Sequence, residues 1–364
     1  MTDVHDTVPG DAAHAVARPA LLLVGAAGAI VVLLGVHRMA DVLGPVFLAL
    51  VLTVTVHPAR AVLRARGVPG WAVHVLLLAL IYSTLAALML AVLASGSRFA
   101  ALLPTYRAEW ESWLGRVAAG LADLGMGQAQ LDGVRDSLDL DRLVSGIGDL
   151  VGGMVGVVSI LALVVSVVFF MTLDAAWFSE RVSTLPGSRR SLSEALSSFA
   201  SGTRRYLVVS TVFGLAVAVL DTAALWWLGV PAAGLWGILA FVTNYIPNIG
   251  FFIGLVPPTV LALLEGGPVM ALLVIAVYIV INFVIQSLIQ PRVVGNAVGL
   301  SGTITMVSLV FWAYALGALG ALLAVPLTLF AKALLVDADP RARWVGSLLA
   351  PHPVLRGSRP RRGP

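Results

Sequence analysis

The sequence predicts an all-α protein that crosses a membrane several times, with two interrupted or re-entrant helical units in its C-terminal part. Hydrophobic residues make up 59% of the 364 residues and charged residues 12%, whereas soluble domains contain about 45–50% and about 25%. Long apolar runs recur along the chain, and those in the C-terminal part are dense in proline and glycine. Backbone groups at membrane depth need internal hydrogen-bond partners, so these runs predict helices.

The first 18 residues contain three aspartates and lack the basic stretch of a cleaved signal peptide. We therefore expect residues 1–18 to remain as a cytoplasmic N-terminal tail, followed by a transmembrane transporter domain over residues 19–336. Five apolar runs come first, at Pro19–Val36, Val42–Val56, Trp71–Ala94, Leu150–Leu173 and Tyr206–Leu228. A span needs about 20 apolar residues, so the chain has room for about six to ten crossings.

Charges between the runs predict the orientation. Arginines without acids follow the second run, and a second arginine group follows the fourth; such loops are typically cytoplasmic. Residues 97–149 are acid-rich, so we expect them to form an external insert. The basic tail, residues 337–364, is again expected in the cytoplasm. With both termini inside, the number of full crossings is even.

Two amphipathic helices are expected outside the spans. The external insert has apolar residues on one helical stripe, namely Trp110, Trp113, Leu114, Val117, Leu121 and Leu124. The second helix is expected at residues 186–205, where Ser191 and Glu194 form a capping box and an apolar face follows. Its flanking arginines place it along the cytoplasmic surface.

The two C-terminal units are Pro231–Leu264, interrupted at residues 244–250, and Thr303–Leu335, interrupted at residues 316–320. Each is too long for one crossing and short for two. If each is a hairpin that enters and leaves by the same face, there are six full crossings; if each crosses fully, the parity is the same. Paired interruptions of this kind indicate a transport site.

Polar residues around the first interruption are the candidate substrate path. Pro247 removes a helical donor and Gly250 permits unwinding, while Asn244 and Asn248 supply amides one turn apart. The alternative is that these amides cap the broken helix. Asn282, Gln286 and Gln290 recur at four-residue spacing in an apolar helix, which favours an aqueous path or, alternatively, interhelical hydrogen bonds.

Two acids are candidates for ion or proton coupling. Asp221 lies inside the fifth apolar run, where an ionised carboxylate costs several kcal/mol unless it is paired or protonated. The alternative for Asp221 is a place at the external rim or a bond to a neighbouring helix. Glu265 precedes Gly266 and Gly267 at the external interface, where a solvated cap is the simpler interpretation.

The sequence offers little for other classes of function. Cysteine is absent, which excludes disulfides and thiol nucleophiles, and no histidine pair has zinc spacing. Phosphate-binding loops and hydrolase elbows are also missing. We therefore expect no enzyme, no catalytic residue, no metal and no cofactor. The basic residues flank apolar runs, so membrane lipid rather than nucleic acid is the expected partner.

The segment from Asn244 to Pro258, with the sequence NYIPNIGFFIGLVPP, resembles the autoinducer-2 exporter family of bacterial membrane permeases. Gln286–Gly295 and Gly317–Leu327 are similar to later motifs of that family, and the layout fits from about residue 20 to 336. The resemblance implies export of a small polar signal such as autoinducer-2, with some relatives linked instead to sodium or proton antiport. It also implies a homo-oligomer, with a pentamer as one candidate.

The leading hypothesis is a secondary transporter in the bacterial inner membrane that exports a small hydrophilic molecule, either an autoinducer-2-like signal or a metabolite. The alternative is a sodium/proton antiporter in which the embedded carboxylate of Asp221 titrates. A third class is a membrane scaffold that binds a partner through the external insert.

Overall fold

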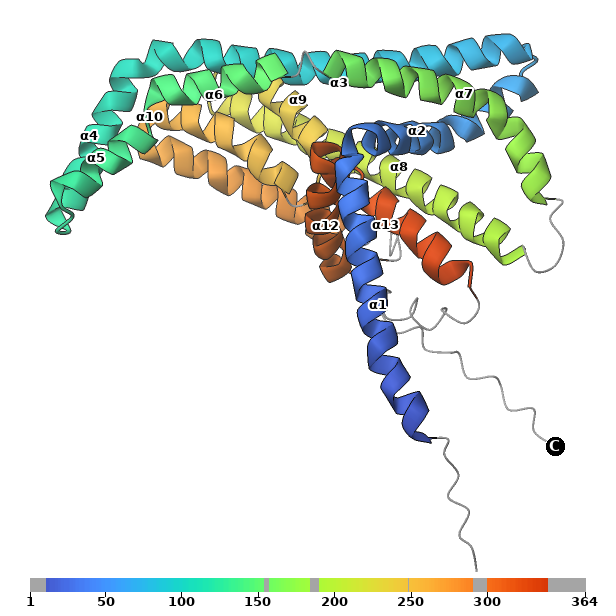
Figure 1. The fold of residues 1–364 in the computed structure, drawn as a ribbon. Helices are drawn as coiled ribbons and strands as arrows, with labels where there is room; N and C mark the ends of the chain where they lie inside the picture. Colours follow the sequence, from blue (N-terminus) through green and yellow to red (C-terminus); the bar gives the residue numbers. More distant parts are fainter. Residues whose placement is uncertain (1–10, 154–156, 184–189, 248, 291–299, 340–364) are drawn as a thin grey trace, which may run out of the picture.

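The computed structural model describes residues 11–153, 157–183, 190–247, 249–290 and 300–339. Within these ranges every regular element is a helix, as Figure 1 shows. The prediction of an all-α fold is therefore confirmed for the part of the chain that the structure describes.

Three helices form the N-terminal part: α1 (Asp11–Arg38), α2 (Ala40–Ala65) and α3 (Gly70–Leu102). With 33 residues, α3 is about 50 Å long. The short loop from α2 joins one end of α3, and the insert continues from the other end (Figure 1). These two ends of α3, the loop end and the insert end, define the two sides of the molecule.

The insert is itself a folded helical unit. It consists of the 3₁₀ turn η1 (Leu103–Tyr106), α4 (Arg107–Asp123), α5 (Gln128–Ser137) and α6 (Leu140–Gly153). The expected bounds, 97–149, differ at both ends. Residues 97–102 continue α3, and α6 extends to Gly153, because no proline interrupts either helix there.

Helix α7 (Val157–Ser183) lies beside α2 and α3 and returns to the loop end, where α8 (Arg190–Trp227) begins. The separate surface helix expected at 186–205 is not found as such. Residues 186–189 lie outside the described part, and from Arg190 onward the segment is the first half of the single 38-residue helix α8. No proline separates its two halves, so the helix continues.

The first interrupted unit is a helical hairpin. Its first arm is α9 (Ala233–Thr243), and its second arm is the first part of α10 (Ile249–Asn282). Helix α10 is broken at Gly267, whose φ of 72° and ψ of −169° are not helical, and it continues into the π-helical η4 (Phe283–Ile289). The 11 residues of α9 span only about 16 Å, about half of a bilayer core.

The second interrupted unit is also a hairpin, formed by α12 (Gly302–Leu322) and α13 (Ala324–Lys332), with the π-helical η5 (Ala333–Asp337) at its end. Gly317, with φ 64° and ψ −144°, breaks α12 inside the predicted interruption. Both predicted interruptions are therefore breaks in the helices.

The two hairpins approach from opposite sides. Residues of α9 and α10 share an apolar cluster with Phe99 and Leu102 at the insert end of α3. Val325 and Leu329 of α13 pack instead with Phe199 near the start of α8, on the loop side, and Leu300 before α12 joins that cluster. The tip of the second hairpin, at Leu316 and Leu323, reaches the middle of α2 and α7.

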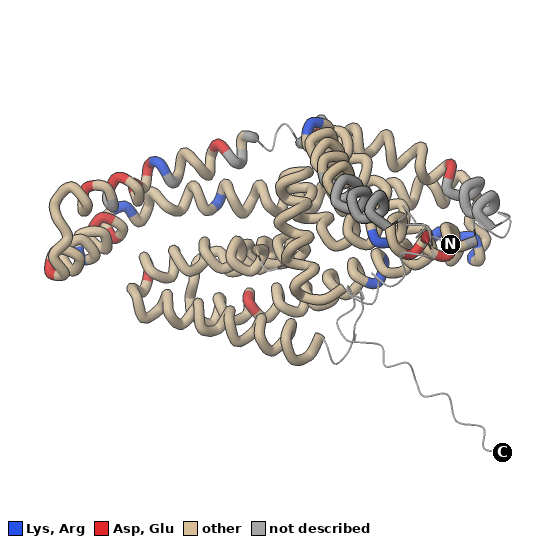
Figure 2. The backbone as a smooth tube through the Cα atoms, turned by 60° about the horizontal axis from the view of Figure 1, so that its bottom comes forward, with Lys and Arg blue, Asp and Glu red and all other residues tan. Residues whose placement is uncertain are grey.

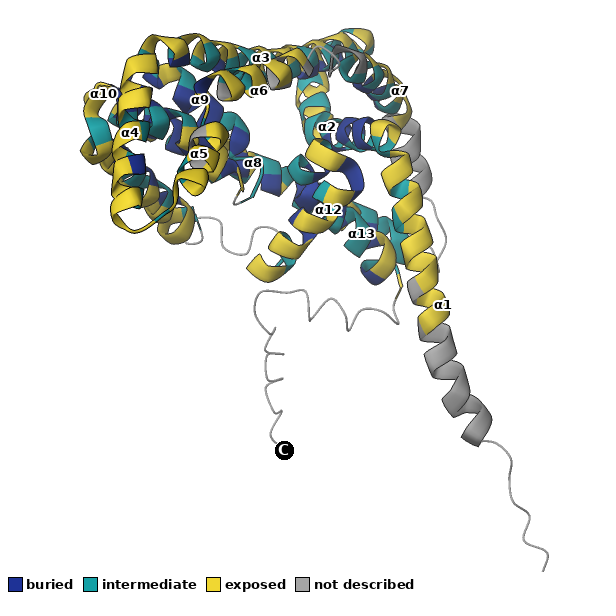
Figure 3. Ribbon diagram, turned by 60° about the vertical axis from the view of Figure 1, so that its left-hand side comes forward, coloured by how far each residue is buried: buried dark blue, intermediate teal, exposed yellow. Residues whose placement is uncertain are grey.

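The outer surface of the bundle is apolar. Exposed residues cover much of α1, α3 and α10 (Figure 3), and many of them are leucine, valine, isoleucine or phenylalanine. Long stretches of helix carry no charge (Figure 2). Among the described residues, five helices are long and apolar enough to cross a membrane, namely Ala40–Ala65, Gly70–Asp123, Ser191–Trp227, Ile249–Ile289 and Gly302–Leu322.

Candidate functional site

Asp221 is buried on α8, and no described residue is its hydrogen-bond partner. Its side chain is 0% exposed, and neither carboxylate oxygen has a hydrogen-bond partner in the described part of the chain. The hydroxyl of the adjacent Thr222 donates to Ala218 O of the same helix at 2.7 Å. A buried carboxylate in this state is costly unless it takes up a proton or a cation.

The carboxylate lines a small cavity between α8 and the first hairpin. Four polar side chains surround the cavity: Asp221, Asn244, Tyr278 and Asn282. The remaining wall is Val217, Ala240, Gly250, Phe251 and Gly254. The space available to the centre of a water molecule is about 10 Å³, so the cavity holds about one water-sized species.

Tyr278 is the second unpartnered group in this cavity. The residue is 1% exposed, and its hydroxyl has no hydrogen-bond partner within the described residues. It lies on the part of α10 that follows the break at Gly267. Among the described residues, the cavity therefore holds one acid that can take up a proton or a cation and one hydroxyl that can hydrogen-bond to a ligand, from two different helices.

The tip of the first hairpin is tied to α8 by hydrogen bonds. Asn244 Nδ2 donates to Ser210 O at 3.2 Å, and Tyr245 Oη lies 2.7 Å from Thr211 Oγ1. Tyr206 Oη donates to Tyr245 O at 3.1 Å. Tyr206 also packs in the cluster that holds α13, so this side chain touches both hairpins.

Gln286 orients the two amides of the cavity. Its Nε2 donates to Asn282 Oδ1 at 2.8 Å and to Asn244 Oδ1 at 3.2 Å. Asn282 Nδ2 donates to Tyr278 O at 2.9 Å. Gln286 lies in the π-helical η4, and π-helical turns within helices are frequent at functional sites.

Two glycines allow the hairpin to close this tightly. A Cβ atom on Gly250 would stand 1.8 Å from Thr243 O, which belongs to the other arm. A Cβ atom on Gly214 of α8 would stand 2.6 Å from Asn244 Nδ2. Gly250 lies in the first turn of α10, so its role in the structure is one of close packing, and the predicted unwinding there stays a prediction.

The structure brings together some of the residues singled out from the sequence. Asp221, Asn244, Gly250 and Asn282 line the cavity, Gln286 bonds two of them, and Pro247 lies in the hairpin turn. Glu265 and Gln290 are not among the lining residues. Asn248 lies outside the described residues. Tyr278 and Tyr245 were missed, although Tyr278 precedes Asn282 by one helical turn.

Glu265 lies at the outer end of the hairpin, against the insert. Tyr106 Oη donates to Glu265 Oε1 at 2.5 Å. Beside this bond, Leu103, Trp110 and Leu140 of the insert segment pack with Leu264 in a small apolar cluster. Glu265 is therefore a contact between the insert and α10 in this structure.

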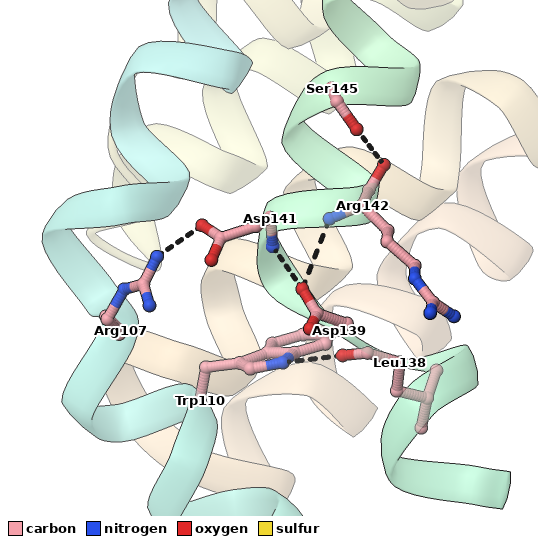
Figure 4. A network of polar contacts seen from close by, with 7 residues as sticks. All are labelled: Arg107, Trp110, Leu138, Asp139, Asp141, Arg142 and Ser145. Carbon is pink, nitrogen blue, oxygen red and sulfur yellow. Dashed lines mark hydrogen bonds and ion pairs between the residues drawn. The ribbon is translucent and has the colours of Figure 1, made fainter.

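Polar contacts hold the insert together next to that cluster (Figure 4). Arg107 pairs with Asp141, and the Trp110 indole N–H donates to Leu138 O at 2.9 Å. Asp139 Oδ1 accepts from the backbone N of Asp141 at 2.7 Å and of Arg142 at 3.2 Å, which caps α6. These contacts hold the helices of the insert together as one folded unit.

A family model described as AI-2E family transporter matches residues 21–338. The chain belongs to the AI-2E transporter family. The resemblance noted from the motifs is therefore confirmed, and membership of this family identifies the chain as a multi-pass membrane transporter.

Three curated relatives match this chain over most of their length. The AI-2 transport protein TqsA of Escherichia coli K12 is 30% identical over 305 residues, covering 83% of this chain and 88% of the relative. The putative transport protein YhhT of the same strain is 29% identical over 311 residues, 85% and 89% respectively. A putative transport protein of Haemophilus influenzae is 28% identical over 327 residues, 88% and 94%.

Proposed function

We propose that this protein is a secondary transporter that exports a small hydrophilic molecule, an autoinducer-2-like signal or a metabolite, along α8 and the first hairpin. The observation that carries the proposal is the cavity lined by Asp221, Asn244, Tyr278 and Asn282. Polar side chains gathered at membrane depth typically line a transport path. The name of the relative TqsA, an AI-2 transport protein, agrees with this class of solute.

The chemistry of the cavity suits a solute with hydroxyl or carbonyl groups. Asparagine amides donate and accept hydrogen bonds, and the Tyr278 hydroxyl does both. In the structure the two amides are engaged with Gln286 and with backbone carbonyls. A solute larger than water therefore enters only when the hairpin tip moves, exchanging these internal bonds for bonds to the solute.

Sodium/proton antiport is the second candidate, and one observation favours it. Asp221 is buried, and its oxygens have no hydrogen-bond partner among the described residues. A single carboxylate balances one proton or one monovalent cation, and the Tyr278 hydroxyl and the asparagine oxygens would supply neutral ligands. The same group could couple solute export to an ion gradient.

Reconstitution in liposomes tests the two candidates together. Flux of a panel of polar solutes is measured with and without imposed pH and sodium gradients, for the wild type, Asp221→Asn and the control Asp123→Asn. Asp123 is exposed at the end of α4, so its neutralisation leaves flux unchanged. For an exporter coupled through Asp221, the wild type moves a solute and Asp221→Asn loses the gradient dependence.

Two results would change this assignment. Sodium/proton exchange in the absence of any solute, lost in Asp221→Asn, would replace the exporter with the antiporter. Gradient-dependent flux that survives in Asp221→Asn would show that Asp221 does not couple transport to the gradient. The proposed solute path would then remain without a coupling role for Asp221.

The cellular setting is part of the proposal. Both termini lie in the cytoplasm, the insert faces outward, and the protein works as a homo-oligomer in the bacterial inner membrane. The charge pattern supports this orientation, because arginines gather around the end of α2 and in the first half of α8 whereas the insert is acid-rich.

A further inference from the structure

We infer that the insert is a fixed support for the outer end of the first hairpin, and that the hairpin tip, Asn244–Pro247, is the part that moves to open the cavity toward the loop side. This inference rests on the proposed function, because it assigns the moving part of the proposed path. It follows from the unequal ways in which the two ends of the hairpin are held.

The outer end is held by apolar packing from several elements. Leu225, Trp236 and Leu261 are each 0% exposed in one cluster with the end of α3. Leu264 adds a second cluster with the insert, and Tyr106 bonds Glu265. Separating these contacts would break up a close-packed cluster of several fully buried side chains and leave voids among them.

The tip is held differently. Asn244 and Tyr245 are half-buried and are joined to α8 by the hydrogen bonds to Ser210, Thr211 and Tyr206, and Asn244 also lies close to Gly214. Each such bond has a small net worth, because water or a solute can replace the partner. The tip can therefore leave α8 at a much smaller cost than the outer end can leave the insert.

A pivot is present where the support ends. Gly267 has φ 72° and ψ −169° and is followed by Pro268, so the two parts of α10 are joined by a break rather than by continuous helix. The first part carries Gly250, Phe251 and Gly254 into the cavity wall, whereas Tyr278 and Asn282 belong to the second part. Rotation at the break lets the second part of α10, with Tyr278 and Asn282, adjust to a moved tip while the insert stays in place.

The absence of cysteine from the sequence allows a direct test with paired cysteines and a bifunctional thiosulfonate reagent. The outer pair is Tyr106→Cys with Glu265→Cys, and the inner pair is Thr211→Cys with Tyr245→Cys. The pairs are matched, since each replaces a tyrosine whose hydroxyl contacts an oxygen of a shorter side chain. Solute flux in liposomes is compared before and after cross-linking.

We expect the inner cross-link to reduce flux to the level of empty liposomes and the outer cross-link to leave it unchanged. Block by the outer pair alone would show a gate on the insert side. Block by both pairs would show that the hairpin moves as a unit, and block by neither that it is static. Each of these three results overturns the inference.

A second readout does not depend on the solute. Val217→Cys, on the cavity wall, is added to each pair, and its modification by a membrane-impermeant thiol reagent is measured after cross-linking from each side of the membrane. We expect modification from the loop side only, lost with the inner cross-link and kept with the outer. If the wild type transports no tested solute but this pattern holds, the proposed function fails while the inference stands; access from the insert side would overturn the inference.

Discussion

Gly237 lets α9 approach α8 beside the buried carboxylate. A Cβ atom at this position would lie 1.8 Å from Thr222 Oγ1 and 2.8 Å from Ala218 O. Small residues allow such close approach between membrane helices, where packing rather than the hydrophobic effect drives association. The glycine thus helps to fix the wall of α8 that carries Asp221.

Replacing Gly237 with alanine should lower the free energy of unfolding by about 1–3 kcal/mol, as overpacking does in other proteins. Gly234→Ala is the matched control, because it lies one turn earlier on α9 and a Cβ atom there meets nothing within 4 Å. Thermal unfolding of the purified protein in detergent measures the difference. Thr222→Ala should restore part of the loss, because it removes the nearer of the two atoms; equal stability of the two glycine variants would contradict the packing role.

For single residues, the sequence indicates charged and amide side chains of the candidate site better than it indicates hydroxyl side chains. Asp221 stands out because a carboxylate in an apolar run is costly, and Asn244 and Asn282 stand out for a similar reason. Tyr278 gives no such signal, since tyrosine is common in membrane helices. Its position beside Asp221 in the cavity depends on how α10 packs against α8. The spacing of residues along one helix gives no information about that packing.

The two arms of the first hairpin approach each other at two glycines, and the approach is closer at one of them than at the other. At Gly250 an added Cβ atom meets the backbone carbonyl of Thr243 at 1.8 Å, and no rotamer change can relieve this. At Gly254 the nearest atom is Ala240 Cα at 3.2 Å, where a small shift suffices. The tight point is thus next to the turn.

Gly250→Ala should therefore abolish transport and lower thermal stability, whereas Gly254→Ala should keep most of both. The ranking is measured as flux per amount of reconstituted protein, alongside unfolding in detergent. Comparable flux in the two variants would argue against the close approach of the two arms.

Breaks in elements were predictable where proline or glycine marked them, as at Pro247 and Gly317. Continuity was harder to predict. The start of α8 was expected as a separate surface helix because of its arginines and capping box, but local signals of a helix start do not exclude helix upstream and downstream. The direction from which each hairpin enters depends on clusters that join residues far apart in the sequence.

The whole molecule distributes its charges unevenly. In Figure 2 charged residues of both signs lie toward the two ends of the long helices, and the acids outnumber the arginines in the insert. Such an asymmetry sets the orientation of membrane proteins.

Single cysteines introduced into the cysteine-free chain test this orientation. Leu124 in the insert is 82% exposed, and Arg66 in the α2–α3 loop is also exposed. On intact cells, Leu124→Cys should react with a membrane-impermeant maleimide, and Arg66→Cys should react only after permeabilisation. The reverse pattern would invert the proposed orientation.

Tyr206 gives the two hairpins a shared boundary. Its hydroxyl bonds the turn of one, and its ring lies in the apolar cluster that contains Val325 and Leu329 of the other, so a displacement of the first turn alters the surroundings of that cluster. Linked binding equilibria are reciprocal. If a ligand bound at one hairpin favours a new position of that hairpin, it shifts the equilibrium at the other hairpin, and a ligand bound there shifts the first by the same free energy. A side chain shared by the two hairpins can in this way transmit occupancy between the two sides of the molecule.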